Sequence, residues 1–226
     1  MRRIEALDLW RSACVFAMII YHTVCDLALL GAAPEGAAGT AAAMAVRYFA
    51  AVGFILISGI CARLSRGCVR RGFAVLCAGL LVSAATALVG MPVKFGILQL
   101  LGCSMLLYGA LRERLDGLRG AALMWSALLA AGAWVCGSVR VGLPFMYPLG
   151  LRTESFYSAD YYPLVPWLFL FLLGTRIGGY IIKNRDAGWA KAHFPAALTF
   201  AGRHSLAIYL LHQPIIYGAL WLLFKK

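Results

Sequence analysis

The chain has 226 residues, of which 62% are hydrophobic and only 13% are charged, which excludes an ordinary soluble domain. A net charge of +12 would suggest nucleic-acid binding in a soluble protein, but here the basic residues gather in alternate breaks between apolar segments. We therefore predict an all-α, polytopic transmembrane bundle that binds no nucleic acid. By the positive-inside rule, its N-terminus is cytoplasmic and its C-terminus extracytoplasmic.

Seven apolar segments are expected to cross the bilayer. No small-residue cleavage site follows the first, so we interpret it as an uncleaved span. The seven cysteines lie in or beside apolar segments without a C-x-x-C pair, which predicts neither a disulfide framework nor a metal site. The expected spans cover approximately residues 7–30, 44–64, 72–89, 95–111, 121–139, 160–182 and 203–224.

Four ionisable residues of the first segment fall on one face of a helix. Arg11 and His22 are eleven residues apart, which places them within about 20° of each other on the helix. Asp8 and Asp26 join the same sector, and the whole stripe is roughly 27 Å long, close to the hydrocarbon thickness. Ionisable groups within a membrane are costly and usually face the bundle interior. His22 is therefore the first functional candidate.

A simpler interpretation of this stripe stays open. Asp8 and Arg11 would anchor the cytoplasmic end, Asp26 would lie in the opposite headgroup layer, and His22 would be a buried, hydrogen-bonded imidazole. Arg47 lies at the membrane level of Asp26, where it either pairs with that carboxylate or reaches lipid phosphates.

Two polar residues lie at or within later spans. Gln99 interrupts the fourth span, where an amide serves either as a hydrogen bond between helices or as part of a site. The longest outer connection ends at Asp160, which is either the N-cap of the sixth span or a carboxylate that binds an acceptor.

The last span carries a second polar ladder. Ser205, Tyr209 and His212 are spaced four and three residues apart and so share one helix face. Pro214 predicts a kink, because it lacks the N–H that would bond the preceding turn. His212 either bonds that kink or belongs to a site.

Together these patterns resemble two families. The R-x10-H spacing of Arg11 and His22 resembles the first-helix signature of the integral membrane acyltransferase-3 group. More closely, four motifs taken in order are similar to bacterial members of the heparan-alpha-glucosaminide N-acetyltransferase catalytic-domain family. They are Leu7-Asp8-x-x-Arg11, Gly96-Ile-Leu-Gln99, Asp160-Tyr-x-Pro163-x-x-Pro166-Trp167 and Gly202-Arg203-His204-Ser205-Leu-x-Ile-Tyr209-Leu-x-His212-Gln213-Pro214.

This resemblance implies a single transmembrane acyltransferase-like domain over residues 1–226, in the inner (plasma) membrane of a bacterium. It implies transfer of an acetyl group from cytoplasmic acetyl-CoA to an extracytoplasmic or lipid-linked sugar, glycan or amine. A guanidinium at Arg11 suits a CoA phosphate. His22, about 16 Å deeper by helical rise, would take the acceptor's proton or the acetyl group itself, and Asp26 would orient its ring.

The remaining candidates divide by role. Donor binding is expected from Asp8, Arg11, Gln99, Arg203 and His204, and acceptor binding from Arg47, Asp160, Tyr209 and His212. Two other functions remain open: a proton-coupled small-molecule transporter that uses the same stripe, and a scaffold whose polar stripes only specify helix pairing. The choice between O- and N-acylation, the acyl chain length, direct transfer against an acyl-enzyme, and the oligomeric state, with a homodimer as one alternative, also stay open.

Overall fold

The structure is a computed structural model that describes residues 3–184, 186 and 188–224. Within that part of the chain there is no strand, and only two isolated bridges join extended segments, Phe95 with Tyr161 and Arg140 with Arg152. The prediction of an all-α fold is therefore confirmed. The basic residues Arg2, Arg185, Lys225 and Lys226, which count in the positive-inside pattern, lie outside the described residues.

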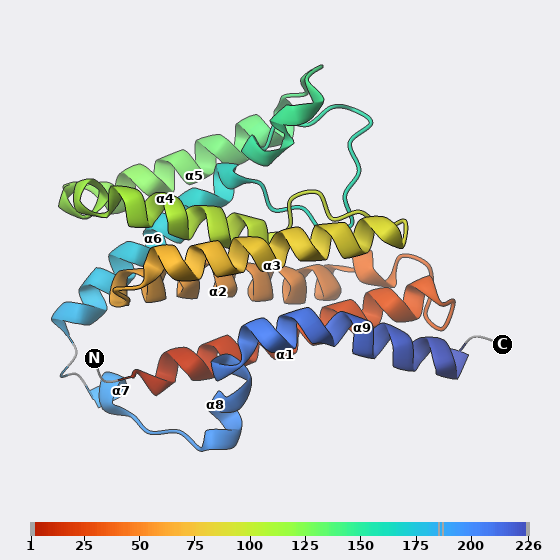
Figure 1. Ribbon diagram of the computed structural model, residues 1–226, viewed down its shortest axis with the longest axis horizontal. Helices are drawn as coiled ribbons and strands as arrows, with labels where there is room; N and C mark the ends of the chain where they lie inside the picture. Colours follow the sequence, from red (N-terminus) through yellow and green to blue (C-terminus); the bar gives the residue numbers. More distant parts are fainter. Residues whose placement is uncertain (1–2, 185, 187, 225–226) are drawn as a thin grey trace. The chain divides into compact units, whose positions relative to one another are not determined.

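Among the described residues, seven long helices match the seven predicted spans (Figure 1). They are α1 (Glu5–Leu29), α2 (Ala41–Leu64), α3 (Cys68–Leu88), α4 (Ile97–Gly117), α5 (Ala121–Ser138), α6 (Leu164–Lys183) and α9 (Ser205–Phe224). Four short elements lie between them: η1 (Ala37–Gly39), η2 (Pro144–Leu149), α7 (Gly188–Lys191) and α8 (Ala196–Arg203).

Six helices of the described residues are long and apolar enough to cross a membrane. The exception among the long helices is α4, whose length of 21 residues is sufficient but whose last turns carry Arg112, Glu113, Arg114 and Asp116. These charges extend α4 beyond the predicted end near residue 111, because a helix continues into water where its side chains are paired or solvated. The chain is a multi-pass membrane protein.

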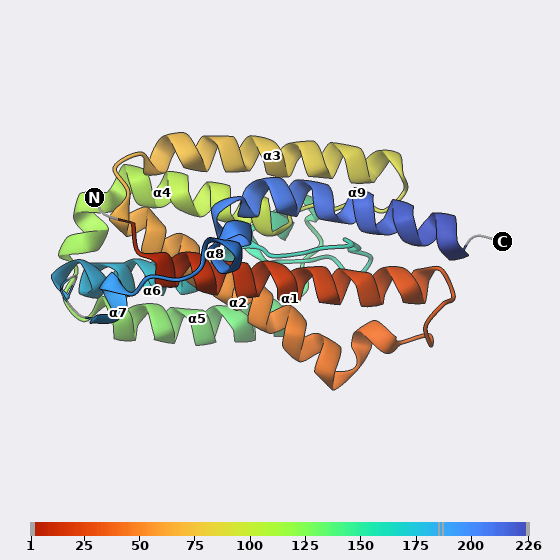
Figure 2. The same cartoon turned by 90° about the horizontal axis from the view of Figure 1, so that it is seen from below.

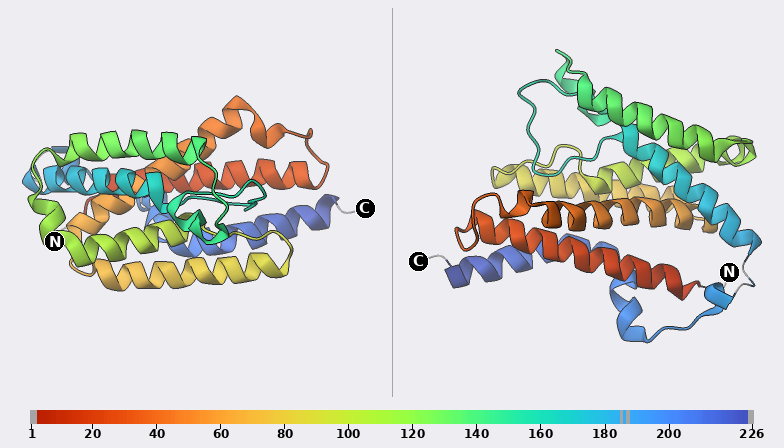
Figure 3. Two further views of the ribbon diagram at one scale, coloured as in Figure 1. Left: turned by 90° about the horizontal axis from the view of Figure 1, so that it is seen from above. Right: turned by 180° about the vertical axis from the view of Figure 1, so that it is seen from behind.

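The chain divides into two compact units, which are described separately. The first unit comprises Met1–Phe54 with Asn184–Lys226, and the second comprises Ile55–Lys183, so α2 contributes to both. In the first unit, α8 and α9 both pack against α1 (Figure 2). In the second, α3 packs on α4, and α6 packs on both α4 and α5 (Figure 3).

Glycine permits close helix contacts in the second unit. A Cβ on Gly59 of α2 would collide with the backbone carbonyl of Phe171 in α6, and one on Gly102 of α4 would lie 2.7 Å from Leu76 in α3. Small residues let helix backbones approach closely where lipid supplies no hydrophobic force between helices.

The connection between α5 and α6 is an ordered, packed segment. Phe156 stacks on Tyr147 with ring centroids 5.5 Å apart and packs at a tilt against Tyr161 with ring centroids 4.8 Å apart. Tyr161 donates its hydroxyl hydrogen to the Tyr147 carbonyl at 2.6 Å, and burial raises the pKa of Tyr161 to about 12. The side chains of this segment therefore pack on each other.

Candidate functional site

The polar stripe predicted on the first helix is present on α1. Asp8 and Asp26 are 4% and 3% exposed, and Arg11 and His22 are partly buried. Arg11 bonds α8, while His22 and Asp26 contact α9. The stripe thus faces the interior of the first unit.

One end of the stripe is an ionic cluster around Asp8. Its carboxylate pairs with Arg3, with Arg11 at 3.2 Å and with Arg203 at 4.0 Å. A buried carboxylate is tolerated when it is paired and hydrogen-bonded in this way. The structure therefore brings together three residues that the sequence assigned to donor binding, Asp8, Arg11 and Arg203.

Gly202 brings α8 onto this end of α1. Its N–H donates to the Ser12 hydroxyl at 2.7 Å, and its carbonyl accepts from the Arg11 guanidinium at 3.2 Å. A Cβ at this position would collide with the backbone carbonyl of Asp8. The Gly-Arg-His motif thus begins with glycine because the two backbones touch here.

The residues that flank α8 extend this contact. Glu5 accepts a hydrogen bond from the Phe194 N–H at 2.8 Å and lies 3.3 Å from the His193 ring nitrogen. His204, which the sequence analysis placed in the first turn of the last span, instead follows α8 as its C-cap with φ −108° and ψ 21°. Its exposed ring packs at a tilt against Phe200, with ring centroids 4.6 Å apart, and no ion pair of the described residues joins it to the cluster around Asp8.

Deeper along α1, two of its side chains, His22 and Asp26, each contact a side chain of α9. We call these four residues the α1–α9 ladder. His22 and His212 lie with ring centroids 5.1 Å apart, and Gln213 donates from Nε2 to Oδ1 of Asp26 at 2.7 Å. His22 and Asp26 are one helical turn apart, so the two contacts are successive rungs. The sequence expected Asp26 to orient His22, but among the described residues no hydrogen bond joins them, because the carboxylate turns to Gln213.

The His212 ring is fixed by its own helix. Its Nδ1 lies 2.7 Å from the Tyr209 carbonyl oxygen, while α9 stays helical through Pro214. Proline removes the donor that would reach the carbonyl four residues earlier, which is that of Leu210. The carbonyl that His212 bonds is therefore not the one that Pro214 frees.

Three ladder atoms are buried without a partner. In the described part of the chain, Asp26 Oδ2, His212 Nε2 and Gln213 Oε1 make no hydrogen bond; the one other such buried atom is Ser104 Oγ. Leaving a buried polar group unpaired costs about 1–3 kcal/mol, so native proteins rarely retain several together. Such concentration in one ladder marks it as a candidate binding site.

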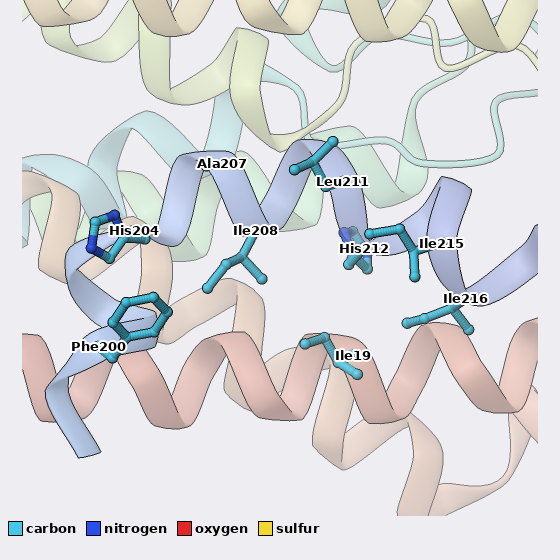
Figure 4. A pocket seen from close by; sticks show the side chains of 9 residues that line it. All are labelled: Ile19, Phe200, His204, Ala207, Ile208, Leu211, His212, Ile215 and Ile216. Carbon is cyan, nitrogen blue, oxygen red and sulfur yellow. The ribbon is translucent and has the colours of Figure 1, made fainter. Parts of the chain in front are cut away.

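A pocket of about 520 Å³ opens beside the first rung (Figure 4). In Figure 4, Ile19 points from α1 toward α9, and Phe200 and His204 lie at one end of the pocket. Its lining is apolar except for the two histidines: Ile19, Phe200, His204, Ala207, Ile208, Leu211, His212, Ile215 and Ile216. An apolar pocket with a few polar groups is typical of a small-molecule site.

Comparison with known families identifies the chain. A family model described as heparan-alpha-glucosaminide N-acetyltransferase, catalytic, matches residues 3–214. The chain belongs to this family. Comparisons with curated proteins and with solved structures gave no match.

Membership in the heparan-alpha-glucosaminide N-acetyltransferase catalytic family confirms the resemblance drawn from the motifs. It makes the protein a member of a transmembrane acetyltransferase family. Most of the matching fourth motif, from Gly202 to Gln213, is the segment that supplies the α8 contact and half of the ladder.

The other predicted residues of this family member have structural partners. The Arg47 guanidinium lies 5.8 Å from the ring centroid of Tyr21, and that ring lies 5.7 Å from His22. Tyr209 lies 5.6 Å from His212. Arg47, through Tyr21, and Tyr209 therefore lie beside the contact between His22 and His212.

Gln99 and Asp160 lie in the second unit, where they cap α4. Gln99 accepts from the Gly96 N–H at 2.9 Å and donates to the Ser83 hydroxyl at 2.5 Å. Asp160 accepts from the Ile97 N–H at 3.4 Å; the predicted cap of the sixth span is wrong, since α6 begins only at Leu164. Asp160 serves α4 because the bridge between Phe95 and Tyr161 carries it there. Of the two interpretations of Gln99, the hydrogen bond between helices accounts for its contacts, since it joins α4 to α3 through Ser83.

Two features escaped the sequence analysis. Gln213 was part of a motif, but its partner Asp26 lies 187 residues away. Asp116 of α4 pairs with Arg63 of α2 and accepts from Tyr108 at 2.9 Å, and its backbone carbonyl accepts from Arg176 of α6. The sequence treated those arginines only as loop charges, and no local pattern indicates that they converge.

Proposed function

We propose that this protein transfers an acetyl group from cytoplasmic acetyl-CoA to an extracytoplasmic or lipid-linked sugar, glycan or amine. We propose further that residues 1–226 act as a single transmembrane domain in the inner membrane of a bacterium. The observation that carries the proposal is the α1–α9 ladder, because two histidines and three unpaired buried acceptor atoms occur together in a member of an acetyltransferase family.

The residues present fit an acyl-CoA donor. The ionic cluster sets three guanidiniums against Asp8 and leaves Arg203 33% exposed, which suits an anionic nucleotide. The apolar pocket leads along α9 toward His212 and suits a flexible, uncharged arm. When bound, the donor supplies a thioester whose acyl carbon is open to attack.

The ladder would provide the reaction centre. His22 lies eleven residues beyond Arg11, about 16 Å along α1 by helical rise. It would take either the acceptor's proton or the acetyl group. Asp26 and Gln213 would orient the acceptor through the two oxygen atoms that their mutual hydrogen bond leaves open.

The proposal is tested on purified protein in lipid nanodiscs with radiolabelled acetyl-CoA. We expect Arg11→Ala to weaken acetyl-CoA binding at least tenfold, since a charge-assisted hydrogen bond contributes about 1.5–3 kcal/mol. The matched control Arg70→Ala, an exposed arginine of α3, should bind as the wild type does.

The second arm measures transfer to a library of cell-envelope glycans and amines. His22→Ala should lower transfer by a hundredfold or more while donor binding is kept. Substrate flux across the membrane without any acyl donor would instead identify a transporter. If the wild type neither binds acetyl-CoA nor moves a substrate across the membrane, and His22→Ala only impairs assembly, the protein is a scaffold.

A further inference from the structure

The proton position on His212 follows from its hydrogen bond. Nδ1 lies 2.7 Å from the carbonyl oxygen of Tyr209, and a carbonyl oxygen can only accept. Nδ1 must therefore carry the hydrogen. In the neutral imidazole, Nε2 then holds a lone pair and no proton.

This lone pair is buried on a residue of the ladder. His212 is 7% exposed, and within the described part of the chain Nε2 is buried and has no hydrogen-bond partner. His22 differs, because its ring makes no hydrogen bond to any described residue that would fix its tautomer. Of the two histidines, His212 is thus the one that is held ready to accept a proton.

The second rung, the contact between Asp26 and Gln213, offers two oxygen atoms that can accept hydrogen bonds. Gln213 follows His212 directly, and its bond to Asp26 leaves Oε1 of the amide and Oδ2 of the carboxylate unpaired and buried. A neutral primary amine has a second hydrogen for one of these oxygens besides the one it gives to Nε2, and a sugar can donate to them from a hydroxyl next to the one that reacts.

We propose that His212 is the proton acceptor of the transfer reaction and that Asp26 and Gln213 are positioning residues that hold the acceptor's nucleophilic group beside it. This inference rests on the proposed function. As the nucleophilic atom bonds to the acyl carbon and the carbon–sulfur bond breaks, Nε2 receives the nucleophile's proton. Nε2 then passes that proton to the departing thiolate sulfur, so His212 returns to its neutral form. Under this inference His22 takes neither the proton nor the acetyl group, unlike in the two alternatives given above. Its ring, whose centroid lies 5.1 Å from that of His212, would instead contact the acyl group, and His22→Ala would remove that contact.

The tautomer is measured first, by nitrogen NMR on the wild-type protein labelled with ¹⁵N-histidine. The chain has four histidines, and the signal lost in His212→Asn assigns this ring. We expect a protonated Nδ1 and an unprotonated Nε2. A proton on Nε2 would overturn the inference even if the protein transfers acetyl groups. If the wild type transfers to no acceptor, the proposed function fails, and the inference fails with it whatever the tautomer.

Transfer is measured next in His212→Asn and His212→Ala. We expect a loss of about 10²–10⁴-fold with acetyl-CoA affinity changed less than about twofold, and added imidazole should restore part of the rate in His212→Ala. The control His193→Asn changes an exposed histidine of the same unit and should transfer normally. Normal transfer by His212→Asn, or a loss that imidazole does not relieve in a folded His212→Ala, would reject His212 as the base.

For the positioning residues, Gln213→Leu should raise the KM for the acceptor and leave donor binding unchanged. Gln213→Asn keeps both the amide donor and the acceptor oxygen on a shorter side chain and should recover part of the acceptor affinity. An acceptor KM that stays at the wild-type value in Gln213→Leu would show that this amide does not position the acceptor.

Discussion

A single missing methyl group determines how closely α8 can approach α1. Gly202 bonds Ser12 and Arg11 with its backbone, and its Cα faces the carbonyl of Asp8. Any side chain there would have to push the two helices apart. The ionic cluster would then lose its geometry, because Arg203 follows directly and reaches the same carboxylate.

Gly202→Ala should therefore lower the free energy of unfolding by about 1–3 kcal/mol, the usual cost of overpacking. The measurement is SDS or thermal unfolding in detergent. Gly218→Ala in α9 is the matched control, because a Cβ added there would meet no other atom within 4 Å. This control should be neutral or more stable, since alanine favours a helix by roughly 0.5–1 kcal/mol. Equal stabilities for the two variants would contradict the contact.

At the scale of elements, a polar cluster in the second unit joins the last turns of α2 and α4 to the second half of α6. The Asp116 carboxylate pairs with Arg63 and bonds Tyr108, while its backbone carbonyl accepts from Arg176. Arg112 adds hydrogen bonds to the carbonyls of Arg63 and Ser65. Asp116 and these arginines therefore hold α2, α4 and α6 together through ion pairs and hydrogen bonds.

Asp116→Ala should destabilise the protein by about 2 kcal/mol, because it leaves partly buried guanidinium and phenol groups without their acceptor. Equilibrium unfolding monitored by circular dichroism measures the change. The control Glu113→Ala removes an exposed carboxylate from the same helix and should stay within about 0.5 kcal/mol of the wild type. If both variants unfold alike, Asp116 does not fasten these helices.

At the scale of the whole molecule, the topology depends on α4, the long helix with the most charged end. A helix of 21 residues reaches roughly 31 Å at about 1.5 Å per residue, enough for the hydrocarbon layer. Its basic end near residue 112 fits the cytoplasmic side by the positive-inside rule.

Reporter fusions should therefore place residue 91 outside, residue 118 inside and residue 141 outside. Fusion at residue 66, in the basic loop between α2 and α3, serves as the internal control. A reporter at residue 118 that reads as external would show that α4 does not cross the membrane, and it would reverse the predicted placement of the later loops.

The sequence by itself determined the membrane class, the seven long helices and the shared polar face of α1, because composition and helical period are local properties of the chain. It also placed His212 and Tyr209 on one face of the last helix. Two predicted starts were displaced: α9 begins after His204, and α6 after Asp160.

Only the tertiary structure decided which side chains meet. Nothing local pairs Asp26 with Gln213, sends Asp160 to the start of α4, or directs Nδ1 of His212 to the Tyr209 carbonyl. A polar group buried in a helix bundle takes the partner that packing brings within about 3 Å. That choice depends on where helices distant in the chain come to lie.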